Sequence, residues 1–372
     1  MFIELHMLQN FSPSNLNRDD SNSPKECTFG GVRRARISSQ CIKRAIRLHP
    51  SFQETTQVEP SARTRFLVSA ISSLLQEAGK PKDEAEKASV NVVGAILGGM
   101  DSKNPLRSKV LFFVSAEENR FITKLILDNW EAALTGKVTE DKALQAGIKA
   151  YKDAFNHRTS APEIAMFGRM LAEDPTLNVD AACQVAHAIS THRVNMEFDF
   201  FTAVDDLQSE TETGAGMMGI IGFNAATFYR YSLIDFDQLV NNLGGDLALA
   251  RKTVEGFLKA AVAAVPTGKQ TSFAAQNPPS FIMAVTREDG AAWSLANAFE
   301  KPVYPRGDQS LLDASVVALD AYWGDLLSFY GGNPNPVVAE IGIKPQLQNL
   351  EAYSVNNMDA WLNQVLIALP GE

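Results

Sequence analysis

Arginine side chains and hydroxyl groups lie close together near the start of the chain, in a pattern that suits phosphate chemistry. An Arg-Arg-Ala-Arg run at positions 33–36 leads into Ser38 and Ser39. Serine is a favoured N-cap, so we predict a helix from Gln40 to about His49. Amide groups at a helix N-terminus bind phosphate oxygens, and guanidinium groups add paired charge-assisted hydrogen bonds. The stretch therefore predicts a site for a phosphodiester backbone.

The extended run divides its arginines between two faces. Side chains of a strand alternate, so Arg34 and Arg36 should share one face while Arg33 takes the other. Gly30 and Gly31 precede the run, and glycine lets a backbone come close to a sugar-phosphate chain. The alternative is a charged surface that faces only solvent.

Charge is unevenly distributed along the chain. The net charge is −9 and the isoelectric point is about 5.2, values that by themselves disfavour nucleic-acid binding. Residues 18–47 nevertheless hold eight basic and three acidic side chains, a net charge of +5 that leaves −14 for the rest. An acidic molecule with one basic strip is typical of a local polyanion site, and a solvated charged face is the plain alternative.

Catalytic and metal-binding patterns are weak. The sequence has no G-x-x-x-x-G-K-[ST] loop, and Gly214-Ala215-Gly216 is only half of a dinucleotide motif. His187 and His192 are five residues apart in a predicted helix, a spacing that disfavours zinc. Asp19-Asp20 and Asp205-Asp206 could hold Mg²⁺ or activate water, but adjacent residues rarely bind one ion together. We expect a protein that is not an enzyme, with no catalytic residue, metal or cofactor; the alternative is a metal-dependent ribonuclease that uses Asp19 or Asp20.

Two further segments have side chains that could contact a nucleic acid. The loop around Lys269 and Gln270 offers a cation, an amide and several hydroxyl groups. Phe200-Phe201 and residues 167–170 place aromatic and methionine side chains beside polar residues. Core packing explains such side chains without any ligand, whereas stacking on single-stranded RNA is the functional alternative.

Cysteine usage and hydropathy indicate a soluble protein of a reducing compartment. Cys27, Cys41 and Cys183 are far apart and lack C-x-x-C spacing, so we expect neither a disulfide framework nor a zinc site. The first residues carry no secretory signal, and no window reaches the roughly 20 apolar residues of a spanning helix. We expect a cytoplasmic protein with no membrane partner.

Strands and helices alternate at both ends of the chain around a helical middle. This order predicts an α+β sheet core that carries a large helical insertion. The glycine-rich stretch 197–223 predicts a hairpin or loop. The predicted strands cover residues 2–8, 29–37, 227–232 and 281–286. The predicted helices cover residues 40–49, 63–78, 82–97, 117–134, 140–155, 180–192, 246–264, 309–329 and 358–368.

Several collinear segments resemble one known family. Residues 11–47, which include Asn-Leu-Asn-Arg-Asp-Asp and Phe-Gly-Gly-Val-Arg-Arg-Ala-Arg-Ile-Ser-Ser-Gln, look like the N-terminus of the CasC family, the backbone subunit of the type I-E Cascade CRISPR surveillance complex. Further similar segments are 186–192, 201–208, 227–231, 268–271 and 295–301. The resemblance runs through most of the chain and is thin between residues 50 and 160 and near the C-terminus.

The resemblance implies an RRM-like (ferredoxin-like) palm with a helical fingers insertion and a β-hairpin thumb. It assigns residues 1–59 to the first part of the palm, 60–180 to the fingers and 181–372 to the second part of the palm, with the thumb at about 195–225. Members of the family polymerise along a CRISPR RNA, and each thumb folds across to a neighbour and displaces a nucleotide at regular intervals. The remaining bases stay free to pair with target DNA, so the protein reads only the RNA backbone.

The resemblance also implies site residues and partners. Met170, Phe201 and Thr202 are expected to form the wedge around the displaced nucleotide. The expected partners are CRISPR RNA, target DNA through guide pairing, copies of the chain in a helical filament and other Cascade subunits. The residues expected to contact RNA are Asn17, Arg18, Lys25, Arg34, Arg36, Ser38, Ser39, Gln40, Lys43, Arg44, Arg47, Arg169, Lys269 and Gln270.

Overall fold

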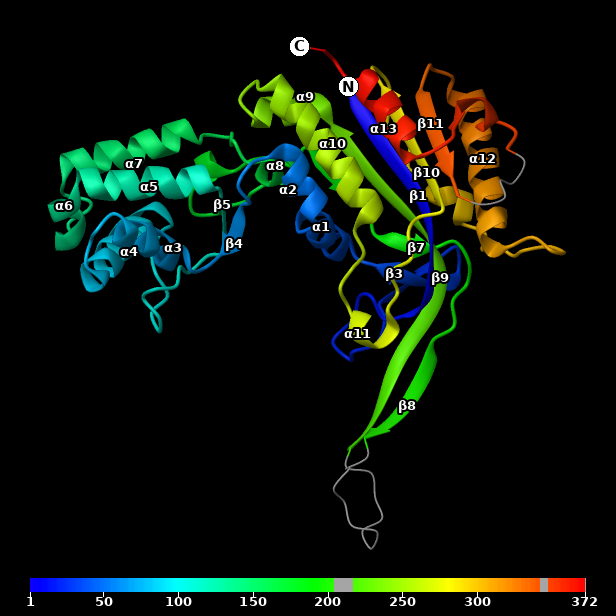
Figure 1. Cartoon of the computed structure of the whole chain (residues 1–372), viewed down its shortest axis with the longest axis horizontal. Helices are drawn as coiled ribbons and strands as arrows, with labels where there is room; N and C mark the ends of the chain where they lie inside the picture. The colour runs from blue at the N-terminus through cyan, green and yellow to red at the C-terminus, as the bar shows by residue number, and fades with distance from the viewer. Residues whose placement is uncertain (204–216, 342–346, 372) are drawn as a thin grey trace, which may run out of the picture. The chain divides into compact units, whose positions relative to one another are not determined.

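The computed structural model of the chain describes residues 1–203, 217–341 and 347–371. These residues form two compact units (Figure 1). Unit 1 comprises Met1–Phe52, Val185–Leu233 and Phe257–Gly371. Unit 2 comprises Gln53–Gln184 and Ile234–Gly256. Among the described residues, one large and mostly antiparallel sheet and 13 helices make this a mixed α/β fold.

A sheet of ten strands is the frame of unit 1. Its order is β12-β11-β10-β1-β9-β7-β3-β2, and β6 and β8 also pair with β9. The β1–β10, β10–β11, β2–β3, β3–β7, β7–β9 and β8–β9 ladders are antiparallel, and the β11–β12 ladder is parallel. The strands are β1 (Phe2–Ser14), β2 (Glu26–Phe29), β3 (Val32–Ile37), β6 (Cys183–Val185), β7 (Ala188–Ser190), β8 (Glu197–Ala203), β9 (Met217–Asp235), β10 (Phe281–Arg287), β11 (Asn335–Glu340) and β12 (Ser354–Val355).

The centre of the sheet is buried on both faces. All seven residues of β10 and residues 3–9 of β1 are buried. Residues 281–285 of β10 are apolar at odd and even positions alike, as expected of a strand covered on both faces, whereas β1 buries Glu4 and His6 among its apolar residues. Helix α12 (Leu311–Tyr330) begins at a capping box formed by Ser310 and Asp313 and supplies Val316, Leu319 and Trp323 to the core. This packing makes the sheet a rigid support for the segments at its edge.

The β2–β3 hairpin and helix α1 (Ser39–Arg47) form that edge. Gly30 and Gly31 make the turn with φ angles of 58° and 76°, a conformation that glycine adopts without strain. Ser38 is the N-cap of α1, as the sequence predicts, and its side chain accepts a hydrogen bond from the amide of Cys41. The strip at residues 33–36 is therefore β3, directly followed by a capped helix.

Strand β8 and the first half of β9 leave the sheet as a long hairpin (Figure 1). Its register pairs Glu197 with Phe223 at the base and Ala203 with Met217 at the end of the described ladder. Residues 204–216 lie outside the described residues, and with them Asp205, Asp206 and the Gly214-Ala215-Gly216 motif. The predicted hairpin of 195–225 falls on this element.

Unit 2 is mostly helical around its own core. Helices α3, α4, α5 and α7 bury one apolar cluster that includes Leu75, Val92, Ile122 and Leu144. A short sheet of β4 (Ala62–Thr64) and β5 (Phe112–Val114) lies beside it. The helices of the chain not yet given are α2 (Pro50–Thr56), α3 (Leu67–Glu77), α4 (Lys82–Ile96), α5 (Ala116–Asp128), α6 (Trp130–Thr135), α7 (Lys142–Ala154), α8 (Pro162–Phe167), α9 (Phe236–Asn242), α10 (Leu247–Ala263), α11 (Gln270–Phe273) and α13 (Met358–Ile367).

The structure differs from the sequence prediction in three places. The helix predicted at 180–192 is wrong, because this stretch forms β6 and β7, and β7 lies between β3 and β9. The helix predicted at 117–134 breaks at Asn129 into α5 and α6. Residues 234–256, predicted within the palm, cluster with unit 2, where the Asn242 amide donates to the carbonyl oxygens of Ala165 and Asp180.

Candidate nucleic-acid interface

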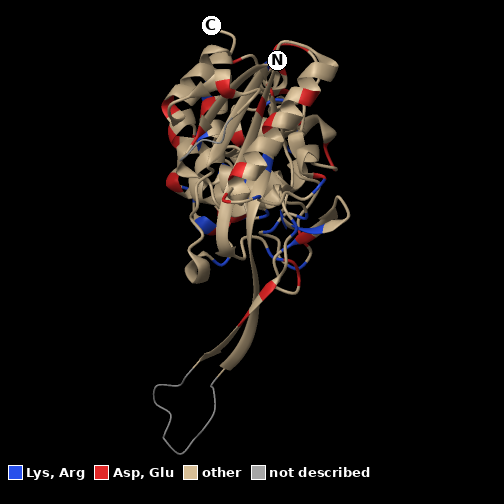
Figure 2. Cartoon of the chain, turned by 90° about the vertical axis from the view of Figure 1, so that its right-hand side faces the viewer, with Lys and Arg blue, Asp and Glu red and all other residues tan. Residues whose placement is uncertain are grey.

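Basic residues gather at the end of unit 1 from which the β8–β9 hairpin projects. Figure 2 shows Lys and Arg gathered around the base of this hairpin, with a few Asp and Glu among them and on the hairpin, while most Asp and Glu are spread over the helices farther from it. The loop between β1 and β2, the β2–β3 hairpin and the start of β8 meet there. A polyanion is therefore attracted to this end of the unit rather than to its acidic remainder.

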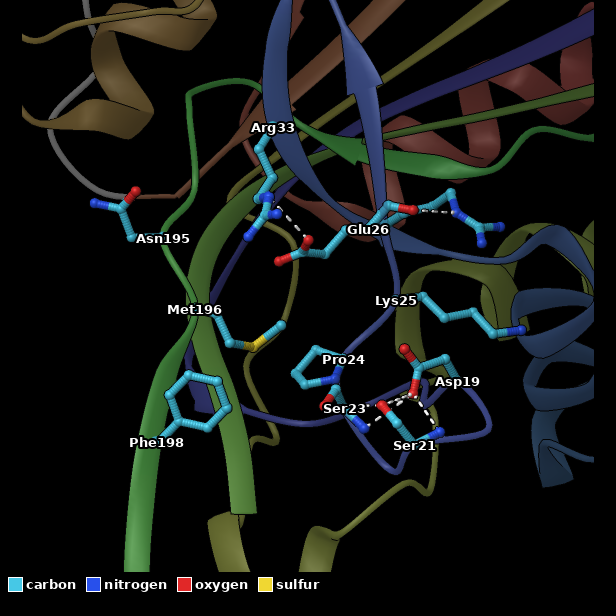
Figure 3. Close-up of a pocket in the computed structure, with 11 residues that line it drawn as sticks. Asp19, Ser21, Ser23, Pro24, Lys25, Glu26, Arg33, Asn195, Met196 and Phe198 are labelled. Atoms are coloured by element: carbon cyan, nitrogen blue, oxygen red, sulfur yellow. Dashed lines mark hydrogen bonds and ion pairs between the residues drawn. The ribbon is translucent and has the colours of Figure 1, made fainter. Parts of the chain in front are cut away.

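An open pocket of about 610 Å³ lies in this surface (Figure 3). In Figure 3, Met196 and Phe198 stand on the hairpin side, and Lys25 and Asp19 stand on the opposite side. Cations, hydroxyl groups and an exposed aromatic ring in one pocket suit a phosphate with a sugar or base beside it. We call it the basic pocket, and the residues that line it are Asp19, Ser21, Ser23, Pro24, Lys25, Glu26, Arg33, Arg36, Asn195, Met196 and Phe198.

Short contacts within unit 1 hold the backbone and the two arginine side chains of the basic pocket. The amide of Lys25 donates to the carbonyl of Asn17 at 2.8 Å, and the amide of Arg36 donates to the carbonyl of Lys25 at 2.9 Å. Nε of Arg36 donates to the carbonyl of Glu26 at 3.2 Å, and Nε of Arg33 lies 3.1 Å from the Glu26 carboxylate. A guanidinium has five N–H donors, so each arginine keeps donors for a phosphate after this one contact.

The start of helix α1 is already occupied by the protein itself. The amide of Ser38 donates to Oδ1 of Asn17 at 2.8 Å, and the amide of Ser39 donates to Nδ1 of His187 at 2.9 Å. Burial, with repulsion from Arg36 and Lys25, lowers the pKa of His187 and keeps its ring neutral and able to accept. The amide groups of Ser38 and Ser39 are therefore already paired within the chain, and the RNA contacts of Ser38, Ser39 and Asn17 stay predictions.

Helix α1 turns its polar side away from the core. Ile42 and Ile46 are buried and anchor the helix to the sheet. Residues 40, 43, 44 and 47 lie on the remaining faces, with Gln40 and Arg44 exposed and Lys43 and Arg47 partly exposed. Arg18, at the start of the loop that lines the basic pocket, is exposed as well. The helix thus extends the basic surface beyond the pocket.

This chain is similar to a known protein family. The chain matches the family model of the CT1975-like proteins, a Cas family, over residues 3–365. This chain belongs to the CT1975-like family. No curated protein matches it at a significant level.

Two solved structures resemble the CT1975-like chain over its full length. A chain from a "CRISPR RNA-guided surveillance complex, pre-nicking" is 30% identical, with a TM-score of 0.86, and the match covers 99% of this chain and 100% of that chain. A chain from a "CRISPR RNA-guided surveillance complex" is 26% identical, with a TM-score of 0.75 and the same coverage. Both likenesses extend through unit 1 and unit 2.

Arg34 of this CT1975-like protein has a structural position, which corrects its predicted RNA contact. The side chain is fully buried and donates to the carbonyl oxygens of Phe29, Ser190, Phe299 and Glu300 at 2.7–3.2 Å. Burial lowers the pKa of its guanidinium. Arg34 therefore joins β3 to β7 and to the segment after residue 295, and a ligand in the basic pocket does not reach it.

Arg169 is buried as well, so its predicted RNA contact also needs correction. Its guanidinium lies in unit 2, 2.6 Å from the carboxylate of Glu118, and its side chain is 1% exposed. The neighbouring Met170 is 83% exposed. Of the two adjacent residues, only the methionine is presented to a ligand.

The loop around Lys269 packs on the segment that leads to the basic pocket. A Cβ atom on Gly268 would lie 2.3 Å from the carbonyl oxygen of Leu16, so glycine permits this close approach. Nε2 of Gln270 donates to the carbonyl groups of Pro266 and Ala275 and shapes the loop from within. Lys269 is partly exposed with a φ of 52°. The structure thus brings together two segments that are about 250 residues apart in the sequence. Of the two predicted contacts in this loop, Lys269 is the residue whose side chain suits a ligand.

The β8–β9 hairpin carries the other predicted wedge residues. Phe201 stands opposite Gly219, where an added Cβ would lie 2.4 Å from the ring, and Thr202 next to it is exposed. Phe198 and Phe200 share the other face of β8 and are 66% and 62% exposed. Stacking platforms for bases need such exposed rings.

Asp19 organises the loop that lines the basic pocket. Its Oδ1 accepts hydrogen bonds from the amide and hydroxyl of Ser21, at 2.9 and 2.7 Å, and from the amide of Ser23 at 3.1 Å. These bonds lower the pKa of Asp19, above all the one from the Ser21 hydroxyl. Asp20 beside it is exposed. In the described part of the chain, no three His, Cys, Asp or Glu residues are grouped so that they could hold a metal ion.

Sequence reasoning missed several residues of the basic pocket. Arg33 was not among the predicted RNA contacts, yet its side chain is 62% exposed at the pocket, while Arg34 is buried. Asn195, Met196 and Phe198 reach the pocket because the β8–β9 hairpin begins there. In the sequence, the only signal for these residues is the alternation of side chains along residues 197–203, which indicates which of them share a face of the strand.

Within the described residues, no helix is long and apolar enough to span a membrane.

Proposed function

We propose that this chain is a non-catalytic, repeating backbone subunit of a type I-E Cascade complex, a cytoplasmic ribonucleoprotein of antiviral defence. It binds the spacer of a CRISPR RNA without sequence preference and presents the RNA for pairing with target DNA. The observation that carries the proposal is the basic pocket, which three cationic side chains line at the base of a projecting hairpin. The full-length likeness to chains of two CRISPR RNA-guided surveillance complexes supports it.

The pocket chemistry fits recognition of the RNA backbone. Arg33 and Arg36 offer several N–H donors each, and Lys25 adds a mobile point charge. Phosphate contacts fix the register of a nucleic acid but do not read its sequence. A guide RNA held by its backbone keeps its base edges free, and base pairing then selects the target.

The sheet supports the proposal of an RRM-like palm. Strands β9 and β10 flank β1, and helix α10 lies between them in sequence. A βαβ unit split by a third strand is a hallmark of ferredoxin-like folds. Unit 2 then corresponds to the fingers, and the β8–β9 hairpin to the thumb.

The exposed apolar side chains support the proposed nucleotide displacement. Met170 is 83% exposed, and the β8–β9 hairpin presents Phe201 and Thr202 at the end of its described ladder. An apolar wedge unstacks a base, and a neighbouring copy of the chain would hold the other side of the displaced nucleotide. Copies of this chain, other Cascade subunits and the CRISPR RNA are the partners that this proposal requires.

A salt titration tests the assignment of the RNA site. Each phosphate contact of a single strand contributes about 0.7 to the slope of log affinity against log salt, so replacing Lys25, Arg36 and Lys43 by Gln lowers the slope by about 2. Fluorescence anisotropy with a labelled single-stranded guide RNA, measured over a series of salt concentrations, gives this slope.

The matched control changes the same number of charges in unit 2. Lys82, Lys124 and Lys137 have side chains that are 70–75% exposed and pair only with acidic neighbours on their own helix turns or loop. Their replacement by Gln should leave the slope unchanged. Equal slopes for the wild-type chain and the Lys25, Arg36 and Lys43 variant would show that the RNA lies elsewhere.

A further inference from the structure

Met170 is an isolated apolar side chain held between two buried neighbours. It is 83% exposed, whereas Arg169 is 5% and Leu171 2% exposed. A methionine in water has no packing partners to hold it, so its place depends on the backbone that carries it. The residues on either side therefore determine where the methionine stands.

The backbone at this point is fixed on both sides of Met170. Gly168 has a φ of 75°, and a Cβ there would lie 3.0 Å from the amide of Ala181 and the carbonyl of Val179. Arg169 and Val179 exchange two backbone hydrogen bonds of 2.9 Å each. After the methionine, the amide of Leu171 donates to Oδ1 of Asn178 at 2.5 Å.

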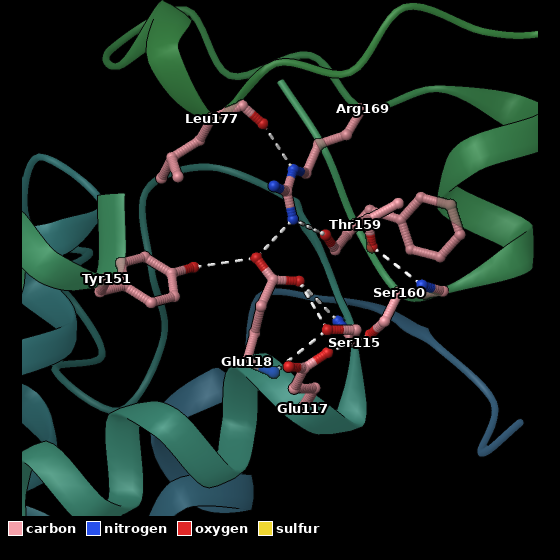
Figure 4. Close-up of polar contacts among 10 residues, drawn as sticks. Ser115, Glu117, Glu118, Tyr151, Thr159, Ser160, Arg169 and Leu177 are labelled. Carbon is pink, nitrogen blue, oxygen red and sulfur yellow. Dashed lines mark hydrogen bonds and ion pairs between the residues drawn. The ribbon is translucent and has the colours of Figure 1, made fainter. Parts of the chain in front are cut away.

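The guanidinium of Arg169 ties this segment to the helical core (Figure 4). Nη1 donates to Oε1 of Glu118 at 2.6 Å and to the carbonyl of Phe113 at 3.1 Å, and Nε donates to the carbonyl of Leu177 at 2.7 Å. A planar fork makes these contacts in fixed directions, which a flexible ammonium does not.

Glu118 is itself held by two helices. It stands in the first turn of α5, where it accepts from the amide and hydroxyl of Ser115 at 2.9 Å, and the hydroxyl of Tyr151 on α7 donates to its Oε1 at 3.0 Å. Burial, followed by the charge of Glu118, raises the pKa of Tyr151, so this hydroxyl remains a donor. The carboxylate therefore fixes Arg169 relative to α5 and α7.

A buried ion pair of this kind is weak evidence for stability. Removing two charges from water costs free energy that their attraction often only offsets, and well-packed apolar residues are frequently as stable. A pair with fixed geometry does define the place of its neighbours. Next to this pair, Met170 is the neighbour whose side chain is exposed.

We infer that Glu118 and Arg169 are positioning residues that present Met170 to the RNA. The inference rests on the proposed function for what Met170 contacts, but the ordering of Met170 itself is a property of the free chain. Arg169 acts through its neighbour and touches no nucleotide.

The test combines two measurements on the full chain with an Arg169→Lys variant, which keeps the charge and loses the fork. In the free protein, the order parameter of the Met170 backbone amide, assigned by Met170→Leu, should fall. The second measurement uses a guide RNA with 2-aminopurine at the displaced position, whose fluorescence rises when the wild-type chain binds and unstacks that base. With Arg169→Lys, most of this rise should be lost, while the affinity for the RNA stays unchanged because unit 1 binds the phosphates.

Control variants separate positioning from general stability. Leu144→Ala weakens the same core without touching Glu118 or Arg169 and should leave the order of the Met170 amide and the fluorescence rise intact. Met170→Ala should abolish the rise. An Arg169→Lys variant with an unchanged amide order parameter at Met170 overturns the inference. If the wild-type chain binds no guide RNA, the proposed function fails instead, and the amide measurement alone decides on the positioning role.

Discussion

Two arginines that are two positions apart on β3 serve different purposes. Arg34 lies in the core and bonds to carbonyl groups, while Arg36 lies at the wall of the basic pocket. The carbonyl groups of Phe299 and Glu300 come from a part of the chain about 265 residues away. Alternation along β3 predicts that Arg34 and Arg36 point to the same face of the strand, but it does not show which distant residues contact each side chain. The sequence therefore suggested the same role for both arginines.

The division between these arginines gives a residue-scale prediction. Arg34→Ala removes one donor from four carbonyl groups, two of them in buried contacts, and should lower the free energy of unfolding by about 3 kcal/mol or more. Arg36→Ala changes a surface position and should shift it by less than about 0.5 kcal/mol while weakening RNA binding. Urea unfolding and RNA anisotropy measure both effects. Equal stability losses in the two variants would contradict this division.

The neutral ring of His187 makes unit 1 sensitive to acid. The folded pKa of His187 lies below the unfolded value of about 6.5, so the unfolded chain binds more protons as the pH falls. The stability from the bond with Ser39 is therefore full above pH about 6.5 and is lost as the pH drops below it. His187→Asn should flatten the stability curve between about pH 7 and 5 in thermal unfolding, relative to the wild-type chain.

A histidine of unit 2 is the control for this pH dependence. His157 has a φ of 51°, which asparagine tolerates, so His157→Asn should fold normally and controls for the loss of a histidine side chain. If His187→Asn and the wild-type chain lose stability in parallel, other groups cause the acid sensitivity.

At the scale of elements, glycines decide how the β8–β9 hairpin carries its aromatic rings. Gly219→Ala would place a Cβ atom 2.4 Å from the ring of Phe201 and must displace that ring. In the proposed complex, this variant should lose most of the 2-aminopurine fluorescence rise while RNA affinity persists. Gly222→Ala is the control, because its Cβ would lie 3.4 Å or more from all neighbours. A full signal from Gly219→Ala would exclude Phe201 as a wedge.

Long elements with strong patterns were predictable, and short ones were not. The helices predicted at 246–264 and 309–329 are α10 and α12 within a residue or two. The helix predicted at 180–192 is wrong because local spacing and the fold disagree there. The apolar residues have helical spacing, at Ala182, Val185, Ala186 and Ile189, but the segment forms the short strands β6 and β7. Pairing with strands far away in sequence overrides local periodicity, and no local pattern reports it.

At the scale of the whole molecule, the chain divides its stability between two cores. Unit 2 buries one apolar cluster around Leu144, and unit 1 buries another around Trp323. Leu144→Ala should cost unit 2 about 2–5 kcal/mol. Hydrogen exchange should then accelerate in α4, α5 and α7 and stay unchanged in β1 and β10. Equal acceleration in both cores would show that the chain unfolds as one cooperative body.

The pairing of β1 with β10 has a consequence for synthesis. Leu8 of β1 stands opposite Phe281 of β10, so one edge of this central strand gains its partner only after more than 270 further residues are made. The partner at its other edge, β9, begins at Met217, about 200 residues after β1 ends. An unpaired edge invites aggregation, so we expect the emerging chain to gain from shielding of this thirteen-residue strand during synthesis.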